Sequence, residues 1–378
     1  PADISPHDIV SELRPDQMQM VEIARAVGQN AKIILLDEPT SSLNFEETEK
    51  LFESIRGLCN AGIGIIFVSH RMNEVRELSD RITILRDGVV IVDGVPMSEK
   101  TDEEIVSDML GEKLNAEEKK HKDSNAFESS AEVLSISFDG YDGELTVKEG
   151  EIVGLAGLAG SGRSSVLRTI WGTKPRSDIH LRYLGEEYKP KNPMHALKKK
   201  IAYISEDRSE SGLFFGQPIK ETVLMAHRNL QRKLLVKNKS EDKLLGQIIG
   251  EVQIKVPTHE CMPEALSGGN QQKLLFGRWI TDEAKLLLLD EPTRGVDIKT
   301  KHEIYQRVRK MVEANNAGAL VVSSELEELV LMCDKVLIIR DGHVEDVLTG
   351  DRITENNMMA EITASGKTKQ QTEDNKSV

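Results

Sequence analysis

The chain has 378 residues and a formal net charge of −14, from 49 basic and 63 acidic side chains. This length allows two or three hydrophobic cores. The acidic balance argues against nucleic acid as the main partner, and no apolar run approaches the roughly 18 residues that a membrane-spanning helix needs. Three cysteines, Cys59, Cys261 and Cys333, are far apart and outside any metal-ligand spacing, which indicates reduced cytosolic thiols.

Residues 1–112 are interpreted as the back half of a first α/β domain. The expected elements are a helix over 16–27, a buried strand over 32–36, a helix over 46–60 and a second buried strand over 64–68. Short, uninterrupted apolar strands that alternate with helices indicate a parallel sheet covered on both faces. Residues 113–131 are charged and polar without an apolar period, so we interpret them as a linker.

A complete second domain is expected over residues 132–362. Strands over 145–147 and 152–155 lead into a glycine-rich loop and a helix over 164–171. A largely helical segment over 219–251 and a strand over 320–322 follow. Residues 363–378 are rich in Lys, Gln, Thr and Asp, a composition typical of a disordered tail.

Two segments recur at a constant spacing. LSGGNQQK begins at Leu266 and is followed by LLLLDEPT, whereas LRPDQMQM begins at Leu13 and is followed by IILLDEPT. Leu13 and Leu266 are 253 positions apart, as are Asp37 and Asp290. The Asp-Gly pairs at 87–88 and 341–342 match at a spacing of 254. The chain is therefore an internal duplication of one domain.

The glycine-rich loop of the second domain has no counterpart at this spacing, because that position would precede Pro1. We therefore expect the first domain to lack its phosphate loop and the chain to be an N-terminally truncated fragment. The alternative is a natural protein whose front half has degenerated.

The glycine-rich loop predicts a phosphate site. Its glycines are Gly157, Gly160 and Gly162, and Ser161, Arg163, Ser164 and Ser165 complete it. Between a strand and a helix, glycines at this spacing aim backbone N–H groups at phosphate oxygens. The usual pattern, G-x-x-x-x-G-K-[ST], has Lys where Arg163 stands, and Arg keeps the charge on a bulkier fork. Ser164 would supply a hydroxyl ligand for magnesium.

Each DEPT segment places two acids at the end of a strand. Asp37 and Asp290 follow four apolar residues each, so each carboxylate lies at the carboxyl end of a buried strand, where α/β sites cluster. There it can ligate the magnesium of a bound triphosphate. Glu38 and Glu291 come next, where they can orient or deprotonate an attacking water. A strand-ending acid that only caps a turn is the alternative, and the two copies of DEPT at one register disfavour it.

These motifs resemble the cassettes of ABC transporters, which are P-loop NTPase domains with a parallel-sheet core, an antiparallel subdomain and a helical subdomain. Over nearly all of residues 1–362, the chain looks like the ATP-binding subunit of a monosaccharide-importing ABC transporter, of the ribose, galactose and xylose kind. Such subunits carry tandem cassettes, and here the first is incomplete. The narrower resemblance depends on Tyr203-Ile-Ser-Glu206-Asp207-Arg208, on Arg163 and on Ser323-Ser324-Glu325. Glu206 stands where other cassettes carry a phosphate-contacting Gln, and Ser324 where they carry a switch His.

Cassettes of this family pair head to tail, so the resemblance implies two unlike ATP sites. The first would combine the missing phosphate loop, Asp37, Glu38 and His70 with Ser267, Gly268, Gly269 and Gln271. It fits hydrolysis, with Glu38 as the base and His70 on the gamma-phosphate. The second would combine residues 157–165, Glu206, Asp290, Glu291 and Ser324 with the degenerate signature at 13–17. Asp16 replaces a glycine there, so this site is expected to bind nucleotide and to hydrolyse it poorly.

The resemblance implies an ATP-hydrolysing energy-coupling subunit, a translocase component with ATP and Mg²⁺ as cofactors. Its partners would be membrane permease subunits and, through them, a periplasmic or lipid-anchored sugar-binding protein, with no nucleic acid. The implied location is peripheral, at the cytoplasmic face of the plasma membrane. Without the first phosphate loop, this chain by itself is expected to be inactive.

Several alternatives stay open at the level of sequence. They are a soluble tandem cassette acting on ribosomes or DNA, an importer for another small solute such as a nucleoside, and a non-hydrolytic regulatory ATP-binding protein. Phe138 or Tyr141 either stacks on adenine or belongs to the core.

Overall fold

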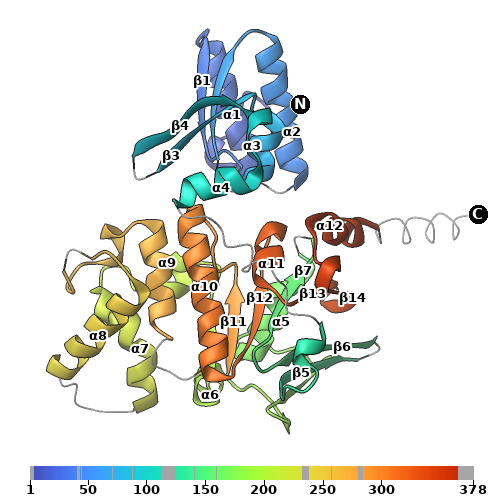
Figure 1. Ribbon diagram of the computed structural model, residues 1–378, viewed down its shortest axis with the longest axis vertical. Helices are drawn as coiled ribbons and strands as arrows, with labels where there is room; N and C mark the ends of the chain where they lie inside the picture. The colour runs from blue at the N-terminus through green and yellow to red at the C-terminus, as the bar shows by residue number, and fades with distance from the viewer. Residues whose placement is uncertain are drawn as a thin grey trace, which may run out of the picture. The chain divides into compact units, whose positions relative to one another are not determined.

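The computed structural model describes residues 4–40, 43, 45–69, 71–86, 88–111, 124–139, 141–158, 160–231, 238–256, 258–279 and 284–364. The chain divides into two compact units (Figure 1). Unit 1 comprises residues 1–115 with 297–299, and unit 2 comprises the remainder. Of the predicted linker, residues 113–123 lie outside the described residues, and Ser124–Phe127 form a 3₁₀ turn.

Unit 1 is an α/β unit with two short sheets. Its α-helices and strands are α1 (Pro15–Gly28), β1 (Ile33–Asp37), α2 (Phe45–Asn60), β2 (Gly64–Val68), α3 (Met72–Leu78), β3 (Arg81–Arg86), β4 (Val89–Pro96) and α4 (Asp102–Leu110). Strands β1 and β2 pair in parallel, and β3 and β4 form an antiparallel hairpin. The four elements predicted in this unit are confirmed to within one residue at each end.

The helices of unit 1 cover one face of the β1–β2 sheet. Ile34 and Leu36 of β1 are buried in a cluster with Leu51 of α2. The alternate residues Ile33 and Leu35 are 60% and 71% exposed. Successive side chains of a strand point to opposite faces of its sheet. Within the described part of unit 1, the sheet is therefore covered on one face, and the expectation of two covered faces is not met there.

Unit 2 is a larger α/β unit. Its strands are β5 (Glu132–Phe138), β6 (Tyr141–Lys148), β7 (Ile152–Ala156), β8 (Ile179–Tyr183), β9 (Glu186–Glu187), β10 (Ile201–Ile204), β11 (Leu286–Asp290), β12 (Gly318–Val322), β13 (Lys335–Arg340) and β14 (His343–Thr349). Its α-helices are α5 (Arg163–Trp171), α6 (Pro193–Lys198), α7 (Ile219–Gln231), α8 (Asn238–Val252), α9 (Gly268–Gly277), α10 (Ile298–Asn315), α11 (Leu326–Met332) and α12 (Glu355–Ala364).

One boundary in unit 2 differs from the sequence-based expectation. The largely helical segment predicted over 219–251 is confirmed, since α7 and α8 lie within it to one residue. Helix α12 continues to Ala364, two residues past the predicted domain end at 362. The remainder of the predicted tail, 365–378, lies outside the described residues.

The core of unit 2 is a six-stranded sheet. The strand order is β10-β11-β12-β7-β13-β14, and every neighbouring pair is parallel except β13 with β14. Strands β7, β11 and β12 are buried along their whole length. Continuous apolar runs such as LLLL in β11 are typical of strands covered on both faces. The predicted parallel-sheet core is confirmed in this unit.

Two further layers complete unit 2. Strands β6, β5, β8 and β9 form an antiparallel sheet, as expected for the antiparallel subdomain. Helices α7, α8 and α9 pack on one another, away from β5 and β6 (Figure 1). Among the described residues, no helix has both the length and the apolar character needed to cross a membrane.

The duplication seen in the sequence is also a duplication of structural elements. Helices α1 and α9 begin at Pro15 and Gly268, and strands β1 and β11 begin at Ile33 and Leu286, each pair 253 positions apart. Strands β2 and β12, beginning at Gly64 and Gly318, are 254 apart. The described residues of unit 1 contain no counterpart of β7, α5 or β10.

Candidate functional site

The glycine-rich loop of unit 2 connects β7 to α5 and is closely packed at both ends. A Cβ on Gly157 would lie 2.4 Å from the carbonyl oxygen of Ile339, and one on Gly162 would lie 2.9 Å from the Cα of Gly342. Gly162 also has a φ of 94°, and it caps α5. Only glycine tolerates this packing. The first N–H groups of α5 have no acceptor within the helix, so the helix begins as an anion site.

Two polar side chains of the loop have contrasting surroundings. The Ser161 hydroxyl is buried and has no hydrogen-bond partner among the described residues. Arg163 donates from Nη1 to the backbone carbonyl of Ser323 at 2.7 Å. Burial lowers the pKa of Arg163, and three nearby carboxylates, led by Glu291, act in the opposite direction. Arg163 therefore joins the glycine-rich loop to the loop after β12.

Asp290, at the end of β11, is fully buried and accepts hydrogen bonds from two hydroxyls. Ser164 Oγ donates to Oδ1 at 2.7 Å, and the Tyr203 hydroxyl donates to Oδ2 at 3.0 Å. Arg168 Nη2 lies 3.9 Å from Oδ2. Burial raises the pKa of Asp290, and these three partners oppose the shift. Ser164 and Asp290 meet as the sequence predicts, whereas the roles of Tyr203 and Arg168 were not evident from it.

The Ser164–Asp290 pair fits a magnesium ion. A hydroxyl and a carboxylate oxygen 2.7 Å apart are hard oxygen ligands, and Mg²⁺ in nucleotide sites uses one or two such ligands and keeps several waters. Asp37, the other predicted metal ligand, is the last residue of β1 in unit 1 and is exposed.

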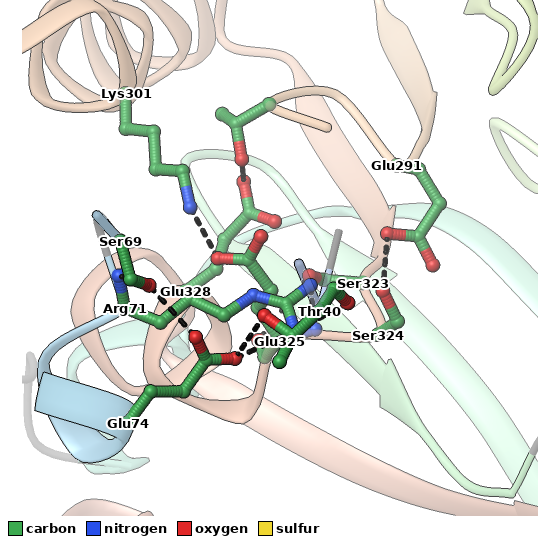
Figure 2. A network of polar contacts seen from close by, with 11 residues as sticks. Thr40, Ser69, Arg71, Glu74, Glu291, Lys301, Ser323, Ser324, Glu325 and Glu328 are labelled. Carbon is green, nitrogen blue, oxygen red and sulfur yellow. Dashed lines mark hydrogen bonds and ion pairs between the residues drawn. The ribbon is translucent and has the colours of Figure 1, made fainter. Parts of the chain in front are cut away.

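Glu291 is held by the loop after β12. Its backbone is left-handed, with a φ of 52°, and its N–H donates to the carbonyl oxygen of Val322 at 2.9 Å. Ser324 Oγ donates to Glu291 Oε2 at 3.0 Å (Figure 2). Burial raises the pKa of Glu291, and hydrogen bonds from Ser324 oppose the shift. A partly buried, perturbed carboxylate beside Ser164 and Asp290 is a candidate acid or base.

A buried glutamate links the loops after β11 and β12. Glu328 of α11 is 2% exposed, and Thr293 Oγ1 donates to it at 2.8 Å. Burial raises the pKa of Glu328 to about 8, and a hydrogen bond from Ser323 opposes the shift. No sequence motif pointed to Glu328. The signal was available, because Glu74 and Glu328 occupy equivalent repeat positions, 254 residues apart.

The Ser267–Gly269 turn forms the N-terminus of α9. Ser267 caps the helix, its hydroxyl accepting from the Asn270 N–H at 3.4 Å. A Cβ on Gly269 would lie 2.8 Å from Thr300 Oγ1, so a side chain there meets a neighbour. The N–H groups of this first turn have no acceptor within the helix. The Gln271 side chain donates instead to the carbonyls of the preceding loop, so its predicted contact with ATP needs a different rotamer.

Glu206 lies in the loop after β10. It forms an ion pair with Arg294, which follows DEPT in the loop after β11. Glu206 is also close enough to Asp290 to raise its pKa. The residue in the place of a phosphate-contacting Gln is therefore an anion held by an arginine, a partnership that the sequence did not reveal.

Unit 1 reproduces the backbone arrangement around DEPT. Glu38 has a φ of 44°, and its N–H donates to the carbonyl oxygen of Val68 at 2.9 Å, as that of Glu291 does to Val322. Asp37 precedes it at the end of β1. His70, predicted beside them, lies outside the described residues.

Unit 1 also contains the buried glutamate. Glu74 accepts from the hydroxyls of Thr40 and Ser69, at 2.6 and 2.7 Å (Figure 2). Arg71 Nη1 adds an ion pair at 3.2 Å. The repeat position of Arg71 in unit 2 is Glu325, which pairs with Lys301 (Figure 2). The glutamates are thus equivalent, but their charged neighbours are not.

The degenerate signature of unit 1 differs from that of unit 2 at its first helical residue. Helix α1 begins with Pro15 at the repeat position of Gly268. Proline has no N–H, so the first turn of α1 presents one donor fewer than that of α9. Arg14 N donates to Gln17 Oε1 at 3.0 Å and closes the turn locally.

Phe138 belongs to the core. It is 3% exposed, and its ring meets that of His343 edge-on at a centroid distance of 5.5 Å. Its stacking on adenine is therefore excluded in this arrangement. The side chain of Tyr141, the other candidate, lies outside the described part of the structure.

Comparisons with known proteins agree with this geometry. Residues 142–294 match the family model of the ABC transporter domain. A solved nucleotide-free ATP-binding cassette from an ABC transporter aligns with a TM-score of 0.51 at 17% identity, over 60% of this chain and 95% of that one. Together, the fold, the glycine-rich loop and the acid-terminated strands define an ATP-hydrolysing cassette of the ABC class.

Curated relatives narrow the class. The galactose/methyl galactoside import ATP-binding protein MglA of Clostridium perfringens is 36% identical over 361 residues, 94% of this chain and 70% of that protein. The ribose import ATP-binding protein RbsA of Bacillus subtilis is 36% identical over 347 residues, 91% of this chain and 70% of that protein. The chain belongs to this family of import ATP-binding proteins, and the resemblance found in the sequence is confirmed.

Proposed function

We propose that this chain acts in the ATP-hydrolysing subunit that energises import of a simple sugar of the ribose, galactose or xylose kind. A separate membrane permease would carry the sugar, delivered by a periplasmic or lipid-anchored binding protein. The expected location is the cytoplasmic face of the plasma membrane. The names of the relatives support the proposal that the solute is a sugar, and one observation supports ATP hydrolysis. It is the occurrence, in one chain, of a glycine-rich loop, a Ser-Gly-Gly helix start and two Asp-Glu pairs at strand ends.

In unit 2, the loop N–H groups and the start of α5 would bind the phosphates of ATP. Ser164 and Asp290 would hold Mg²⁺, which neutralises phosphate charge when bound. The unpaired Ser161 hydroxyl is a further donor for a phosphate oxygen. Arg163 would help to hold the loop after β12 through Ser323, rather than acting only as a phosphate ligand.

We assign hydrolysis to Glu38 of unit 1 rather than to Glu291 of unit 2. The support comes from each unit by itself. Glu291 has Ser324 beside it, at the repeat position that His70 occupies in the first half, and a serine hydroxyl does not exchange a proton near neutral pH as an imidazole does. The α1 turn lacks the donor that Pro15 removes, whereas the α9 turn keeps its glycines. The site with Glu291 would therefore bind nucleotide and turn over slowly.

A pair of glutamine substitutions tests this division in the complete gene product, reconstituted with its membrane partner. Glu38→Gln is expected to lower the steady-state ATPase rate about 100-fold or more, because it removes the general base. Glu291→Gln is the matched control and is expected to keep most of the rate. Equal losses in both variants would contradict the assignment of hydrolysis to Glu38.

The same preparation separates the rival functions. Uptake of labelled ribose, galactose or xylose into vesicles that depends on Glu38 supports sugar import, and uptake of a nucleoside alone would replace the sugar. Tight binding to ribosomes or DNA would favour a soluble cassette, which the net charge of −14 disfavours. The absence of any ATPase activity that Glu38→Gln removes would favour a non-hydrolytic regulator.

A further inference from the structure

The segment after β10 is bonded to both ends of α9. Near its start, Arg208 Nη1 donates to the carbonyl oxygen of Gly268 at 2.9 Å. Near its end, Gly212 accepts at its carbonyl from Arg278, which follows α9 and is 6% exposed. The segment is closed on itself by a bond of 2.7 Å from the Leu213 N–H to the Arg208 carbonyl. Residues 208–213 therefore contact α9 near both of its ends.

The Arg208 guanidinium fits between two glycines. A Cβ on Gly268 would lie 3.2 Å from Nη1, and one on Gly295 would lie 3.1 Å from Nη2. Side chains at either position would press on the guanidinium. Burial and the neighbouring Arg294 lower the pKa of Arg208, so the guanidinium is a partly desolvated cation packed against backbone.

The Gly268 carbonyl and the Gly269 N–H belong to one planar peptide group and point in opposite directions. A charged donor on that oxygen therefore fixes the direction of the Gly269 N–H. It also polarises the peptide, which makes the N–H a stronger donor. This N–H lies in the first turn of α9, where the helix leaves it without an acceptor.

We propose that Arg208 is a positioning residue for the Gly269 N–H, which it aims at the phosphate of ATP bound at the Ser267–Gly269 turn. Arg208 acts through the peptide group and does not touch the nucleotide. The inference rests on the proposed function for the identity of the anion, and on the hydrogen bond from Arg208 to Gly268 within unit 2 for the role of Arg208.

The first test needs no activity. In the present chain, labelled with ¹⁵N-glycine, Arg208→Gln is expected to shift the amide resonance of Gly269, because that nitrogen shares the peptide whose oxygen loses its donor. Arg307→Gln is the matched control. Arg307, on α10, also donates to a backbone carbonyl, but to that of Glu251 and not to that of Gly268. An unchanged Gly269 resonance in Arg208→Gln would overturn the proposal.

The second test measures ATP hydrolysis by the complete gene product with its membrane partner. Arg208→Gln is expected to lower kcat about 10- to 100-fold, because loss of an aimed donor weakens binding of the transferring phosphoryl. The KM should change less, and Arg208→Lys should recover part of the rate. A normal kcat in Arg208→Gln beside an inactive Glu38→Gln would refute the positioning role alone. An active Glu38→Gln would refute the proposed function and leave the resonance test to decide on Arg208.

Discussion

The strand pairs β1–β2 and β11–β12 carry the same motif in the same register, yet their surroundings differ. Both end in an Asp-Glu pair whose glutamate is left-handed and bonded to the neighbouring strand. Leu288 of β11 is fully buried, whereas Leu35, its repeat equivalent, is 71% exposed. Local sequence therefore sets the backbone of the motif, and the elements packed around it set the burial of its side chains.

The buried glutamates Glu74 and Glu328 also differ between the two units, in their charged neighbours. Glu74 and Glu328 each accept from a threonine hydroxyl, and Glu74 also forms an ion pair with Arg71. In unit 2 the repeat position of Arg71 is Glu325, which pairs with Lys301 and helps to raise the pKa of Glu328. Burial is the main cause of the raised pKa of Glu328, about 8, and the Glu325 carboxylate adds to it.

The largest expected effect is a pH dependence of the stability of unit 2 through Glu328. The folded state keeps the Glu328 proton up to about pH 8, whereas the unfolded chain loses it near the ordinary value of 4.5. The free energy of unfolding of unit 2 therefore falls as the pH rises through this window, by at most about 5 kcal/mol. Glu328→Gln stays neutral and is expected to lack this fall.

Urea unfolding followed by tryptophan fluorescence measures this, because both tryptophans of the chain, Trp171 and Trp279, lie in unit 2. Glu74→Gln in unit 1 is the control and should leave the fluorescence-detected slope unchanged. The same slope in Glu328→Gln and the unsubstituted chain would show that Glu328 is not the group responsible.

The next effect contrasts the two strands directly. Leu288→Ala is expected to destabilise unit 2 by about 2–5 kcal/mol, because it opens a cavity in a closed core. Leu35→Ala should change the stability of unit 1 by no more than about 0.5 kcal/mol, since its side chain is largely in solvent. Tryptophan fluorescence reports the first and circular dichroism the second. A comparable loss at both positions would mean that Leu35 is covered in solution.

The smallest effect concerns the threonine hydroxyls. Thr293→Val removes a donor from Glu328 and is expected to cost about 1–3 kcal/mol, because a buried acceptor loses one of its partners. Thr40→Val should cost less, because Glu74 keeps the charged Arg71 as well as the Ser69 hydroxyl, whereas Glu328 keeps the Ser323 hydroxyl. Unfolding midpoints of the two variants test this order, and a larger loss for Thr40→Val would reverse the comparison.

The sequence predicted most of the fold because its signals are local. Apolar runs gave β1, β2, β7 and β12, and the glycine spacing gave the loop before α5. The Ser164–Asp290 contact was also predictable, because the ligand chemistry of a nucleotide site demands both.

Contacts between segments that are distant in the sequence could not be predicted from it. Tyr203 and Asp290 are 87 positions apart, and Arg208 and Gly268 are 60 apart, so no periodicity joins them. The pairing of Glu206 with Arg294 likewise depends on how two loops meet at the end of the sheet. Glu328 is different, since comparing the two halves of the chain would have revealed an acid kept at one repeat position.

The left-handed backbone at Glu38 and Glu291 limits how a duplicated cassette can lose its chemistry. Branched aliphatic residues are strained in this conformation, so a direct replacement of either glutamate by Val or Ile would damage the fold as well as the reaction. Substitutions that lower the activity of one half are therefore expected at neighbouring residues with ordinary backbone angles. Ser324, at the repeat position of His70, is a divergence of this kind.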